Sequence, residues 1–337
     1  MRSILVVGPS WIGDTVLAQP LFKLLHARQA GLSLDVLAPR WTLPLLERMP
    51  EVRRVIPSPF LHGDLKLRER RRLGLELGRE GYDQAIVLPN TFKSALVPLF
   101  AGIRLRTGYL GELRHWVLND ARRLDAERLP QLAQRYAALG LPRGEALRIP
   151  LPTPALRVDE AARRALLARL GLDRGRPAAV LCPGAEYGPA KRWPARYFAE
   201  LAQGFAARGC AVWLIGSQND REAGAEIERA AGGVCRNLCG DTTLAEAIDL
   251  VASSAVVVSN DSGMMHVAAA LGRPLVALYG SSSPAFTPPH SSNARILKLD
   301  LPCSPCYQRV CPLGHFNCMM QLTPDRVLAA VDFDRIS

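Results

Sequence analysis

Short apolar runs alternate with longer segments of helical periodicity along the first half of the chain. The apolar runs end at turns rich in Gly and Pro and predict buried strands. They lie at 4–7, 32–38, near 55, and 84–88. The segments between them place apolar residues at helical spacing and predict helices at 16–29, 42–49 and 66–79. This alternation is typical of a parallel sheet covered on both faces.

The same alternation restarts in the second half. The predicted strands lie at 178–182, 211–215, near 234, 255–258 and 274–279. The predicted helices lie at 158–171, 195–208, 219–231, 243–253 and 323–331. The stretch 125–150 also has a helical pattern, and the prolines of IPLPTPA that follow it indicate a boundary.

A chain of 337 residues is long for a single hydrophobic core. We therefore expect an α/β protein with two Rossmann-like, parallel-sheet domains that face a central cleft. The predicted domains are 1–160 and 161–322, and a C-terminal helical segment, 323–337, is expected to pack back on the first domain. In such folds ligands bind at the carboxyl ends of the strands.

The segment 259–272, SNDSGMMHVAAALG, connects a predicted strand to an Ala- and Met-rich helix. Asp261 or Ser262 can cap this helix, so that the backbone N–H groups of Ser262, Gly263 and Met264 are directed outward. Such donors and the positive end of the helix dipole form a site for phosphate oxygens. Taken alone, the segment fits an ordinary capped helix equally well.

Three charged residues lie in or near the loops after predicted strands. Asp14 follows the first strand and can act as a general base, or it can cap the next helix. Lys191 can neutralise a diphosphate leaving group, or it can be a solvated loop lysine. Glu222 can accept hydrogen bonds from ribose hydroxyls, or it can serve as a first-turn helix carboxylate.

His266 lies one turn into the helix of segment 259–272, where it can donate to a phosphate or sugar oxygen or simply belong to the core. Neither a G-x-G-x-x-G fingerprint nor a P-loop is present, which disfavours dinucleotide enzymes and ordinary kinases. The acidic pair Asp332 and Asp334 lies at the extreme C-terminus, away from any predicted strand end. We interpret it as a solvated tail rather than a metal-binding sugar-nucleotide site.

The formal net charge of +11 calls for an acidic partner or an anionic surface. Nucleic acid is disfavoured, because no zinc finger or basic motif interleaved with aromatic residues accompanies the charge. Phosphorylated lipid or sugar is the other candidate, and an arginine-rich face can also be merely solvated. The arginines cluster at Arg68, Arg70, Arg71 and Arg72, and again at Arg104, Arg106, Arg114, Arg122 and Arg123.

Four of the eight cysteines, Cys303, Cys306, Cys311 and Cys318, lie close together near the C-terminus. One C-x-x-C pair in a protein of the cytosol suggests metal more than a disulfide, and His315 could replace a ligand. The second pair lacks the spacing of a zinc knuckle. A structural zinc therefore stays an alternative to free thiols packed in a proline-rich loop.

Several segments together resemble the ADP-heptose heptosyltransferases of glycosyltransferase family nine, and the resemblance runs nearly end to end. No single segment is specific, whereas their combination is. The matching segments are PSWIGDTVLAQPL, NTFKSAL, RTGYLGELRHWVLND, PGAEYGPAKRWP and SNDSGMMHVAAALGRPLVALYGSSSP.

The resemblance implies a GT-B fold and an inverting transfer of heptose from ADP-heptose that needs no metal and no other cofactor. It implies that Asp14 is the base, that Lys191 binds the diphosphate and that Glu222 binds the ribose. The remaining implied substrate contacts are the turn Asp261, Ser262 and Gly263 with Met264, His266, one of Thr242 and Thr243 at the adenine, and, less directly, Glu186 and Tyr187.

The resemblance also implies a lipid-linked acceptor, the inner core of lipopolysaccharide. The segments favour members that add a heptose to the first heptose of that core over members that use other acceptors. A non-catalytic nucleotide-sugar sensor is a further alternative, which Asp14 disfavours. No segment reaches the roughly 18 apolar residues of a membrane span. We expect a cytoplasmic protein that contacts the inner leaflet of the inner membrane peripherally.

Overall fold

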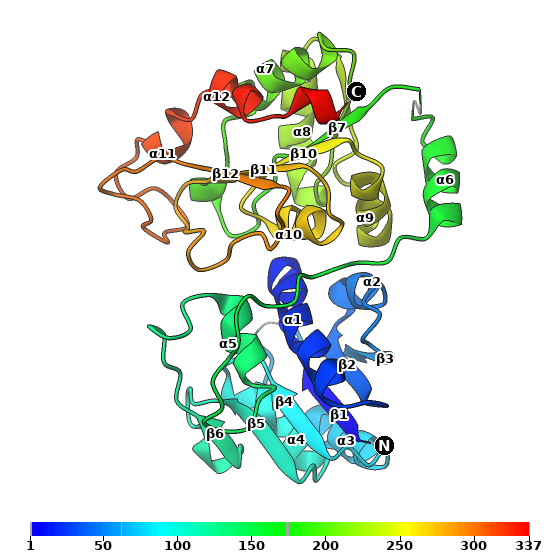
Figure 1. Cartoon of the computed structure of the whole chain (residues 1–337), viewed down its shortest axis with the longest axis vertical. Coiled ribbons are helices and arrows are strands. Elements are labelled where there is room, and N and C mark those ends of the chain that lie inside the picture. Colours follow the sequence, from blue (N-terminus) through cyan, green and yellow to red (C-terminus); the bar gives the residue numbers. More distant parts are fainter. Residues whose placement is uncertain (1, 62, 173–174, 337) are drawn as a thin grey trace. The chain divides into compact units, whose positions relative to one another are not determined.

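The computed structural model describes residues 2–61, 63–172 and 175–336, and the chain divides into two compact units. The units are Met1–Pro154 and Ala155–Ser337, so the division falls slightly before the predicted residue 160. Each unit is a parallel sheet with helices on both faces, as the alternating sequence pattern predicts (Figure 1).

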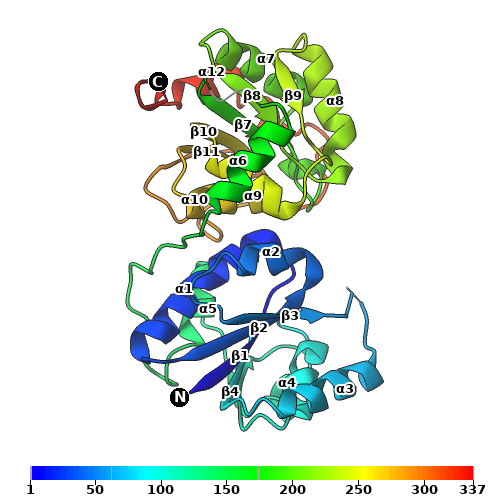
Figure 2. The same ribbon diagram turned by 90° about the vertical axis from the view of Figure 1, so that its right-hand side faces the viewer.

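The first unit has a six-stranded sheet of order β3-β2-β1-β4-β5-β6, and all its strand pairs are parallel. Helices α1, α2 and α5 cover one face, and α3 and α4 cover the other (Figure 2). The strands are β1 Ser3–Val7, β2 Ser33–Pro39, β3 Arg54–Ser58, β4 Gln84–Val87, β5 Leu105–Tyr109 and β6 Asp120–Arg122. The helices are α1 Ile12–Arg28, α2 Leu43–Leu46, α3 Leu67–Gly78, α4 Leu96–Phe100 and α5 Leu132–Ala138, with short 3₁₀ turns η1 Arg40–Thr42, η2 Phe92–Ala95 and η3 Arg114–Trp116.

The second unit repeats this plan with the order β12-β11-β10-β7-β8-β9, again all parallel. Its strands are β7 Ala178–Cys182, β8 Ala211–Leu214, β9 Cys235–Asn237, β10 Val256–Asn260, β11 Leu275–Tyr279 and β12 Ala294–Lys298. Its helices are α6 Glu160–Arg169, α7 Ala195–Ala206, α8 Arg221–Ala230, α9 Leu244–Ala252, α10 Gly263–Ala270, α11 Asn317–Met320 and α12 Pro324–Ala329, with 3₁₀ turns η4 Pro189–Lys191, η5 Gln218–Asp220 and η6 Phe333–Arg335.

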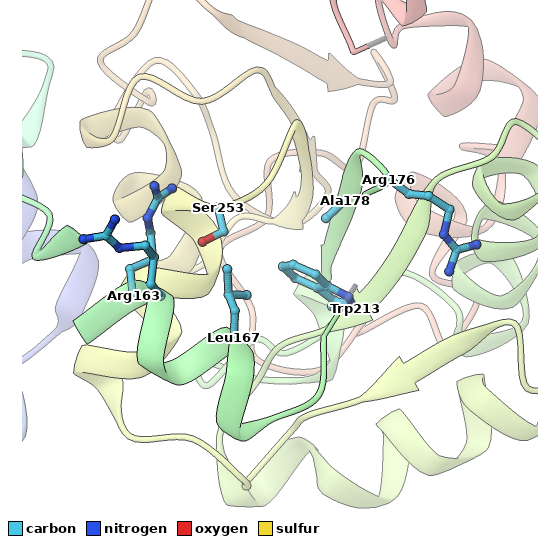
Figure 3. A pocket seen from close by; sticks show the side chains of 7 residues that line it. Arg163, Leu167, Arg176, Ala178, Trp213 and Ser253 are labelled. Carbon is cyan, nitrogen blue, oxygen red and sulfur yellow. The ribbon is translucent and has the colours of Figure 1, made fainter. Parts of the chain in front are cut away.

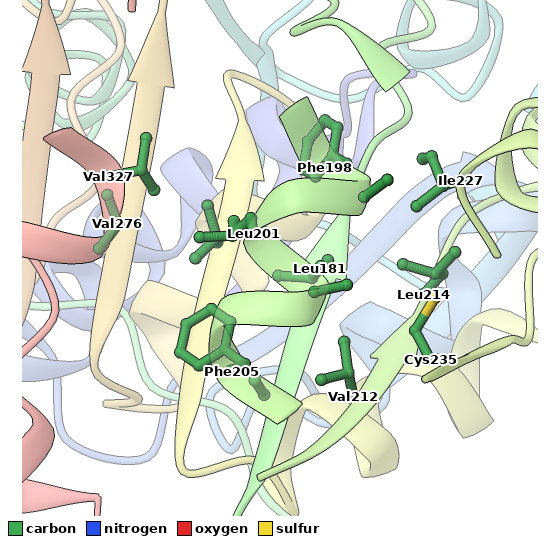
Figure 4. Close-up of a cluster of buried hydrophobic side chains, with 14 of the residues drawn as sticks. Leu181, Phe198, Leu201, Phe205, Val212, Leu214, Ile227, Cys235, Val276 and Val327 are labelled. Atoms are coloured by element: carbon green, nitrogen blue, oxygen red, sulfur yellow. The ribbon is translucent and has the colours of Figure 1, made fainter. Parts of the chain in front are cut away.

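The core of the second unit forms where α7 packs on the sheet. Phe198, Leu201 and Phe205 of α7 are fully buried against Leu181 and Leu214 of the central strands (Figure 4). Aliphatic and aromatic side chains at helical spacing on α7 thus meet the continuous apolar runs of buried parallel strands. This core fixes the strands whose carboxyl ends carry the predicted donor-site residues.

The C-terminal helix α12 packs on the core of the second unit. Helix α12 lies against α7 of its own unit, and Val327 belongs to the same buried cluster as Phe205. Leu328 lies against Gly204, where an added Cβ would be 2.8 Å from the Leu328 side chain. The apolar face of α12 therefore completes the second core.

Two sequence predictions are wrong in detail. The helix after β1 begins at Ile12 instead of Val16, which places Asp14 in its first turn instead of a loop. The stretch 125–150 is mostly irregular, and the helix within it is the short α5. No helix in the described ranges is both long enough and apolar enough to cross a bilayer.

Candidate active site

The predicted donor-site residues of the second unit lie in or just beyond loops that leave the carboxyl ends of its strands. Lys191 follows β7, Glu222 follows β8, Thr242 follows β9 and Asp261 follows β10. Neighbouring parallel strands end at one edge of the sheet, so these loops share that edge. The edge is the one at which α/β folds bind ligands.

Lys191 and Asp261 form an ion pair with a distance of 2.6 Å between Nζ and Oδ2. Their side chains are 19% and 5% exposed, so the pair is largely shielded from water. The Ser282 hydroxyl, from the loop after β11, donates to the same carboxylate oxygen. The pair therefore joins three loops, and the lysine that the sequence assigns to the diphosphate already has a fixed partner.

Asn260 holds the loops of this pair together. Its Nδ2 donates to the Pro183 carbonyl at 2.8 Å, and its Oδ1 accepts from the Trp193 backbone N–H at 3.2 Å. The segment that carries Lys191 is thus anchored on both sides to the end of β10. Such anchoring fixes the position of a charge before any ligand arrives, which is the requirement for electrostatic preorganisation.

The start of α10 differs from the predicted capped helix. Ser262 is the N-cap residue, but among the described residues its side chain makes no capping hydrogen bond. Its hydroxyl lies 3.1 Å from the Ser259 hydroxyl instead, and Asp261 is engaged by Lys191. The first N–H groups of α10 therefore have no side-chain cap, and Ser262, Gly263 and Met264 are only partly buried. This favours an external anion as their partner.

His266 is 4% exposed, and its Nδ1 is buried without a hydrogen-bond partner in the described part of the chain. Burial lowers the pKa of its imidazole to about 4; Asp261 opposes this shift, and His290 and Lys191 reinforce it. His266 is therefore neutral near pH 7. The same region holds two further buried polar atoms without a partner among the described residues, His290 Nε2 and Ser281 Oγ.

Tyr187 lies beneath two cations beside the ion pair. Lys191 Nζ and the Arg309 guanidinium each lie 5.2 Å from its ring centroid. Its hydroxyl donates to the Tyr307 carbonyl at 2.7 Å, so the C-terminal loop is tied to the segment of Lys191. Glu186, its neighbour, accepts a long hydrogen bond of 3.5 Å from Asn219.

Thr242 and Thr243 have different roles in the structure. Thr243 caps α9 in a reciprocal capping box with Glu246, so its side chain has a structural role. Thr242 Oγ1 is buried and has no partner among the residues that the structure describes. An ion pair of 2.8 Å between Arg221 and Asp241 ties the exposed Glu222 region to this loop. Of the two hydroxyls, that of Thr242 is therefore the one without a hydrogen-bond partner among the described residues.

Asp14, the predicted base, lies in the first turn of α1 in the first unit and is partly buried. Helix α5 packs against α1, and its Tyr136 is buried. Burial and the nearby charge of Asp14 raise the pKa of the Tyr136 phenol well above its usual value. Asp14 thus lies at the carboxyl edge of the first sheet, next to a neutral phenol.

Four of the clustered arginines are structural. Arg106 donates to the carbonyls of Val117 and Ile103, and Arg122 donates to Asp120 and to the Ala138 carbonyl. Arg70 is 4% exposed and donates to the carbonyls of Leu65, Asp64 and Lys93. Arg114 is fully buried and donates to the carbonyls of Pro89 and Tyr109. Exposed guanidiniums that could meet an anionic ligand are those of Arg68, Arg71, Arg72, Arg104 and Arg123.

All eight cysteines are free thiols. Across 2–61, 63–172 and 175–336, no group of three or more His, Cys, Asp and Glu side chains is arranged to hold a metal ion. Cys311 accepts hydrogen bonds from backbone N–H groups of residues 313–316, which lower the pKa of its thiol. The zinc alternative therefore has no preformed ligand set at Cys303, Cys306, Cys311 and Cys318.

A cavity of about 160 Å³ lies at the opposite, amino edge of the second sheet (Figure 3). Arg163 and Leu167 of α6, Trp213 of β8 and Ser253 after α9 line it. Arg163 is already paired with Glu160. Because the cavity lies away from the strand ends that carry Lys191, it does not belong to the candidate active site.

Sequence reasoning missed Ser282, Asn260 and His290 as parts of the site. The run GSSSP directly after the strand β11 was the available signal for Ser282, since it places hydroxyls at the sheet edge. No local pattern distinguishes Asn260 from an ordinary strand-end residue. Its function depends on contacts to Pro183 and Trp193, far away in the sequence.

The chain is similar to known glycosyltransferases along most of its length. Residues 70–317 match the family model "Glycosyltransferase family 9 (heptosyltransferase)". The lipopolysaccharide heptosyltransferase 2 of Escherichia coli K12 is 48% identical over 96% of both chains. The lipooligosaccharide heptosyltransferase 2 of Haemophilus influenzae is 46% identical over 88% of both.

A solved structure supports the same assignment. The E. coli ADP-heptose lipopolysaccharide heptosyltransferase II matches with a TM-score of 0.89 and 46% identity, over 99% of this chain and 98% of that chain. The GT-B fold predicted from the sequence is thereby confirmed. This chain belongs to glycosyltransferase family 9, the heptosyltransferases, and is an enzyme of that class.

Proposed function

We propose that this enzyme transfers L-glycero-D-manno-heptose from ADP-heptose to the first heptose of the lipopolysaccharide inner core, with inversion and without a metal ion. The observation that carries the proposal is the 48% identity over 96% of both chains with a lipopolysaccharide heptosyltransferase 2. The geometry of the second unit supports it, because Lys191 and the uncapped start of α10 suit a diphosphate.

In the proposed reaction Asp14 removes the proton from a hydroxyl of the acceptor heptose. That oxygen attacks the anomeric carbon of ADP-heptose from the face opposite to ADP. The new bond between carbon and oxygen forms as the bond to the diphosphate oxygen breaks, which inverts the anomeric centre. The charge that develops on ADP is stabilised by Lys191 and the first N–H groups of α10.

The other donor contacts follow from the chemistry of the remaining side chains. Glu222 is proposed to accept hydrogen bonds from the ribose hydroxyls, and Thr242 to contact the adenine through its unpartnered hydroxyl. Neutral His266 is proposed to bind a phosphate or sugar oxygen. Asp261 is proposed to position Lys191 rather than touch a phosphate, since two anions repel each other.

The acceptor is proposed to be lipid-linked, and the enzyme to contact the anionic inner leaflet peripherally through the exposed guanidiniums of Arg68, Arg71 and Arg72. Binding to vesicles with and without anionic lipid tests this contact. Replacement of these three arginines by glutamine should abolish the difference between the two kinds of vesicle.

The deciding experiment offers ADP-heptose and lipid cores that carry zero, one or two heptoses. The proposal expects transfer to the core with one heptose, unchanged turnover after exhaustive treatment with EDTA, and no transfer by the variant Asp14→Asn. Transfer only to the core without heptose would assign a type I enzyme, and transfer only to the core with two heptoses a type III enzyme. Donor binding without any transfer would favour a nucleotide-sugar sensor.

A further inference from the structure

Two half-exposed tryptophans flank the loop that leads to Asp14. Trp11 is 50% exposed and Trp41 is 46% exposed, although the second unit buries Trp193 and Trp213 almost completely. Burial of an indole contributes a large favourable free energy, which an exposed indole does not obtain. Exposed indoles therefore often mark a binding surface. The two rings therefore form a candidate binding surface.

The two rings come from adjoining loops. Trp11 follows β1 and Trp41 follows β2, which pair in parallel with Val7 opposite Leu37. The Trp41 indole N–H donates to the Ser10 carbonyl at 2.8 Å, which fixes its ring beside the loop of Trp11. The Gly8 backbone N–H donates to the Leu37 carbonyl at 2.9 Å and holds the bases of the two loops together.

Trp11 is also fixed relative to Asp14. It is the N-cap residue of α1, and both the backbone N–H and the hydroxyl of Thr15 donate to its carbonyl at 2.9 Å. Asp14 follows three residues later, about one helical turn along the chain. A ligand that lies on these rings would therefore be close to the Asp14 carboxylate.

A cation accompanies the two rings. Arg40 precedes Trp41 directly and is exposed, and its guanidinium makes no hydrogen bond or ion pair with any described residue. Apolar faces beside a guanidinium suit an acidic oligosaccharide: the C–H faces of its pyranose rings stack on indoles, and its carboxylate or phosphate pairs with arginine. A plain apolar partner would leave the guanidinium without a counter-charge.

We propose that Trp11 and Trp41 bind the acceptor sugar next to Asp14, and that Arg40 binds an acidic group of the same oligosaccharide. This inference rests on the proposed function, because that function makes the ligand near Asp14 the acceptor. It adds the residues that would select an acidic glycan on the acceptor side. A lipid surface is the competing occupant, and the test distinguishes the two.

The test measures steady-state kinetics with ADP-heptose and a deacylated, water-soluble inner-core oligosaccharide that carries one heptose. We expect Trp11→Ala and Trp41→Ala each to raise the KM for this acceptor roughly three- to tenfold. Arg40→Gln should do the same, and the KM for ADP-heptose should not change. Trp116→Ala is the matched control, because Trp116 is 82% exposed but follows β5, away from the loop of Asp14.

An unchanged acceptor KM in both tryptophan variants would overturn the inference. It would also be overturned if the variants lost activity only with an acceptor embedded in vesicles, because the rings would then contact lipid. Equal effects of Trp116→Ala would contradict the placement beside Asp14.

A binding measurement separates this inference from the proposed function. Titration of the enzyme with the same oligosaccharide should change tryptophan fluorescence, and Trp11→Phe together with Trp41→Phe should abolish most of that change. This change without any heptose transfer would support the inference and contradict the proposed function. Transfer that is insensitive to both alanine variants would support the function and contradict the inference.

Discussion

The Lys191 ammonium and the Asp261 carboxylate lie 2.6 Å apart and are held by loops that are 70 residues apart in the sequence. A diphosphate that binds at this site contacts a lysine whose position is already fixed and whose ammonium is already paired with a carboxylate. The N–H groups of α10, which have no side-chain cap among the described residues, supply the additional positive potential. Anion binding at this edge therefore depends on the pair and the helix start together.

Replacement of Lys191 by alanine should impair use of the donor. It removes the ammonium that pairs with Asp261, so the charge that develops on the departing ADP loses a fixed counter-charge. We expect kcat/KM for ADP-heptose to fall by about 10²- to 10³-fold. Arg192→Ala is the matched control, since Arg192 is adjacent but exposed and should leave the kinetics nearly unchanged. Equal kinetics of Lys191→Ala and wild type would remove this lysine from the site.

The same substitution should destabilise the second unit. Lys191→Ala leaves a carboxylate that is 5% exposed and that keeps, among the described residues, the Ser282 hydroxyl as its hydrogen-bond partner. Breaking one side of such a pair costs about 3–5 kcal/mol, because a buried charge stays uncompensated. Adding Asp261→Asn removes that charge and should restore part of the loss. Urea unfolding measures the free energy of unfolding of the single and the double variant. If the effects of Lys191→Ala and Asp261→Asn simply added, the two side chains would not stabilise each other.

The buried strands and the helices between them could be predicted from the sequence because their patterns are local. The runs at β1, β7 and β10 are continuous and apolar, as expected for strands buried on both faces. Strands β5, β6 and β12 were missed, because none forms an apolar run: β5 contains Gly108, β6 is short and carries Asp120 and Arg122, and β12 is partly exposed. The helical pattern at 125–150 fails because its prolines and glycines interrupt it.

The site was predictable as a set of residue types but not as a set of contacts. Lys191 and Asp261 could be named because each follows a strand, at the edge where such sheets bind ligands, whereas the choice between Thr242 and Thr243 stayed open. Their pairing depends on how loops distant in sequence meet, which no local spacing encodes. The cap expected from Asp261 or Ser262 is the clearest example, since Asp261 pairs with Lys191 instead and Ser262 makes no capping hydrogen bond among the described residues.

His266 should make the stability of the second unit depend on pH. Its pKa is about 4 in the folded chain, against 6.5 for an ordinary histidine. Between these values the unfolded chain binds more protons, so stability is fully present above pH 6.5 and is lost as the pH falls toward 4. The loss from this group should be roughly 2 kcal/mol at pH 5.

Urea unfolding at pH 7, 6 and 5 measures this loss in the wild type and in His266→Gln. Between pH 7 and pH 5 the free energy of unfolding of the variant should fall by roughly 2 kcal/mol less than that of the wild type. His290→Gln is the comparison, because burial also lowers the pKa of His290 and accounts for a separate share. Identical slopes in His266→Gln and wild type would show that His266 can be protonated in the folded chain.

Arg114 should be essential for the loops at the carboxyl edge of the first sheet. Its guanidinium is fully buried and ties the carbonyl of Pro89, after β4, to that of Tyr109, at the end of β5. Arg114→Met leaves both carbonyls without this donor and should cost at least about 3 kcal/mol. Arg104→Met is the matched control on the exposed surface and should change stability by less than about 0.5 kcal/mol. Comparable unfolding midpoints of the two variants would contradict this structural role.

Asp14→Asn should separate chemistry from donor binding. The amide keeps the size of the side chain in the first turn of α1 but cannot take a proton from the acceptor hydroxyl. We expect kcat to fall by at least about 100-fold, within the range that general bases contribute. The Kd for ADP-heptose, measured by calorimetry, should stay within about twofold, because the donor contacts are assigned to the second unit.

A structural loss must be distinguished from a catalytic one, and Tyr136→Phe provides that control. The phenol of Tyr136 feels the charge of Asp14, so removing its hydroxyl perturbs the surroundings of Asp14 but keeps the carboxylate. Tyr136→Phe should therefore retain much more turnover than Asp14→Asn at an equal unfolding midpoint. Near-normal turnover of Asp14→Asn would contradict the general-base role, because the asparagine amide cannot accept the proton of the acceptor hydroxyl.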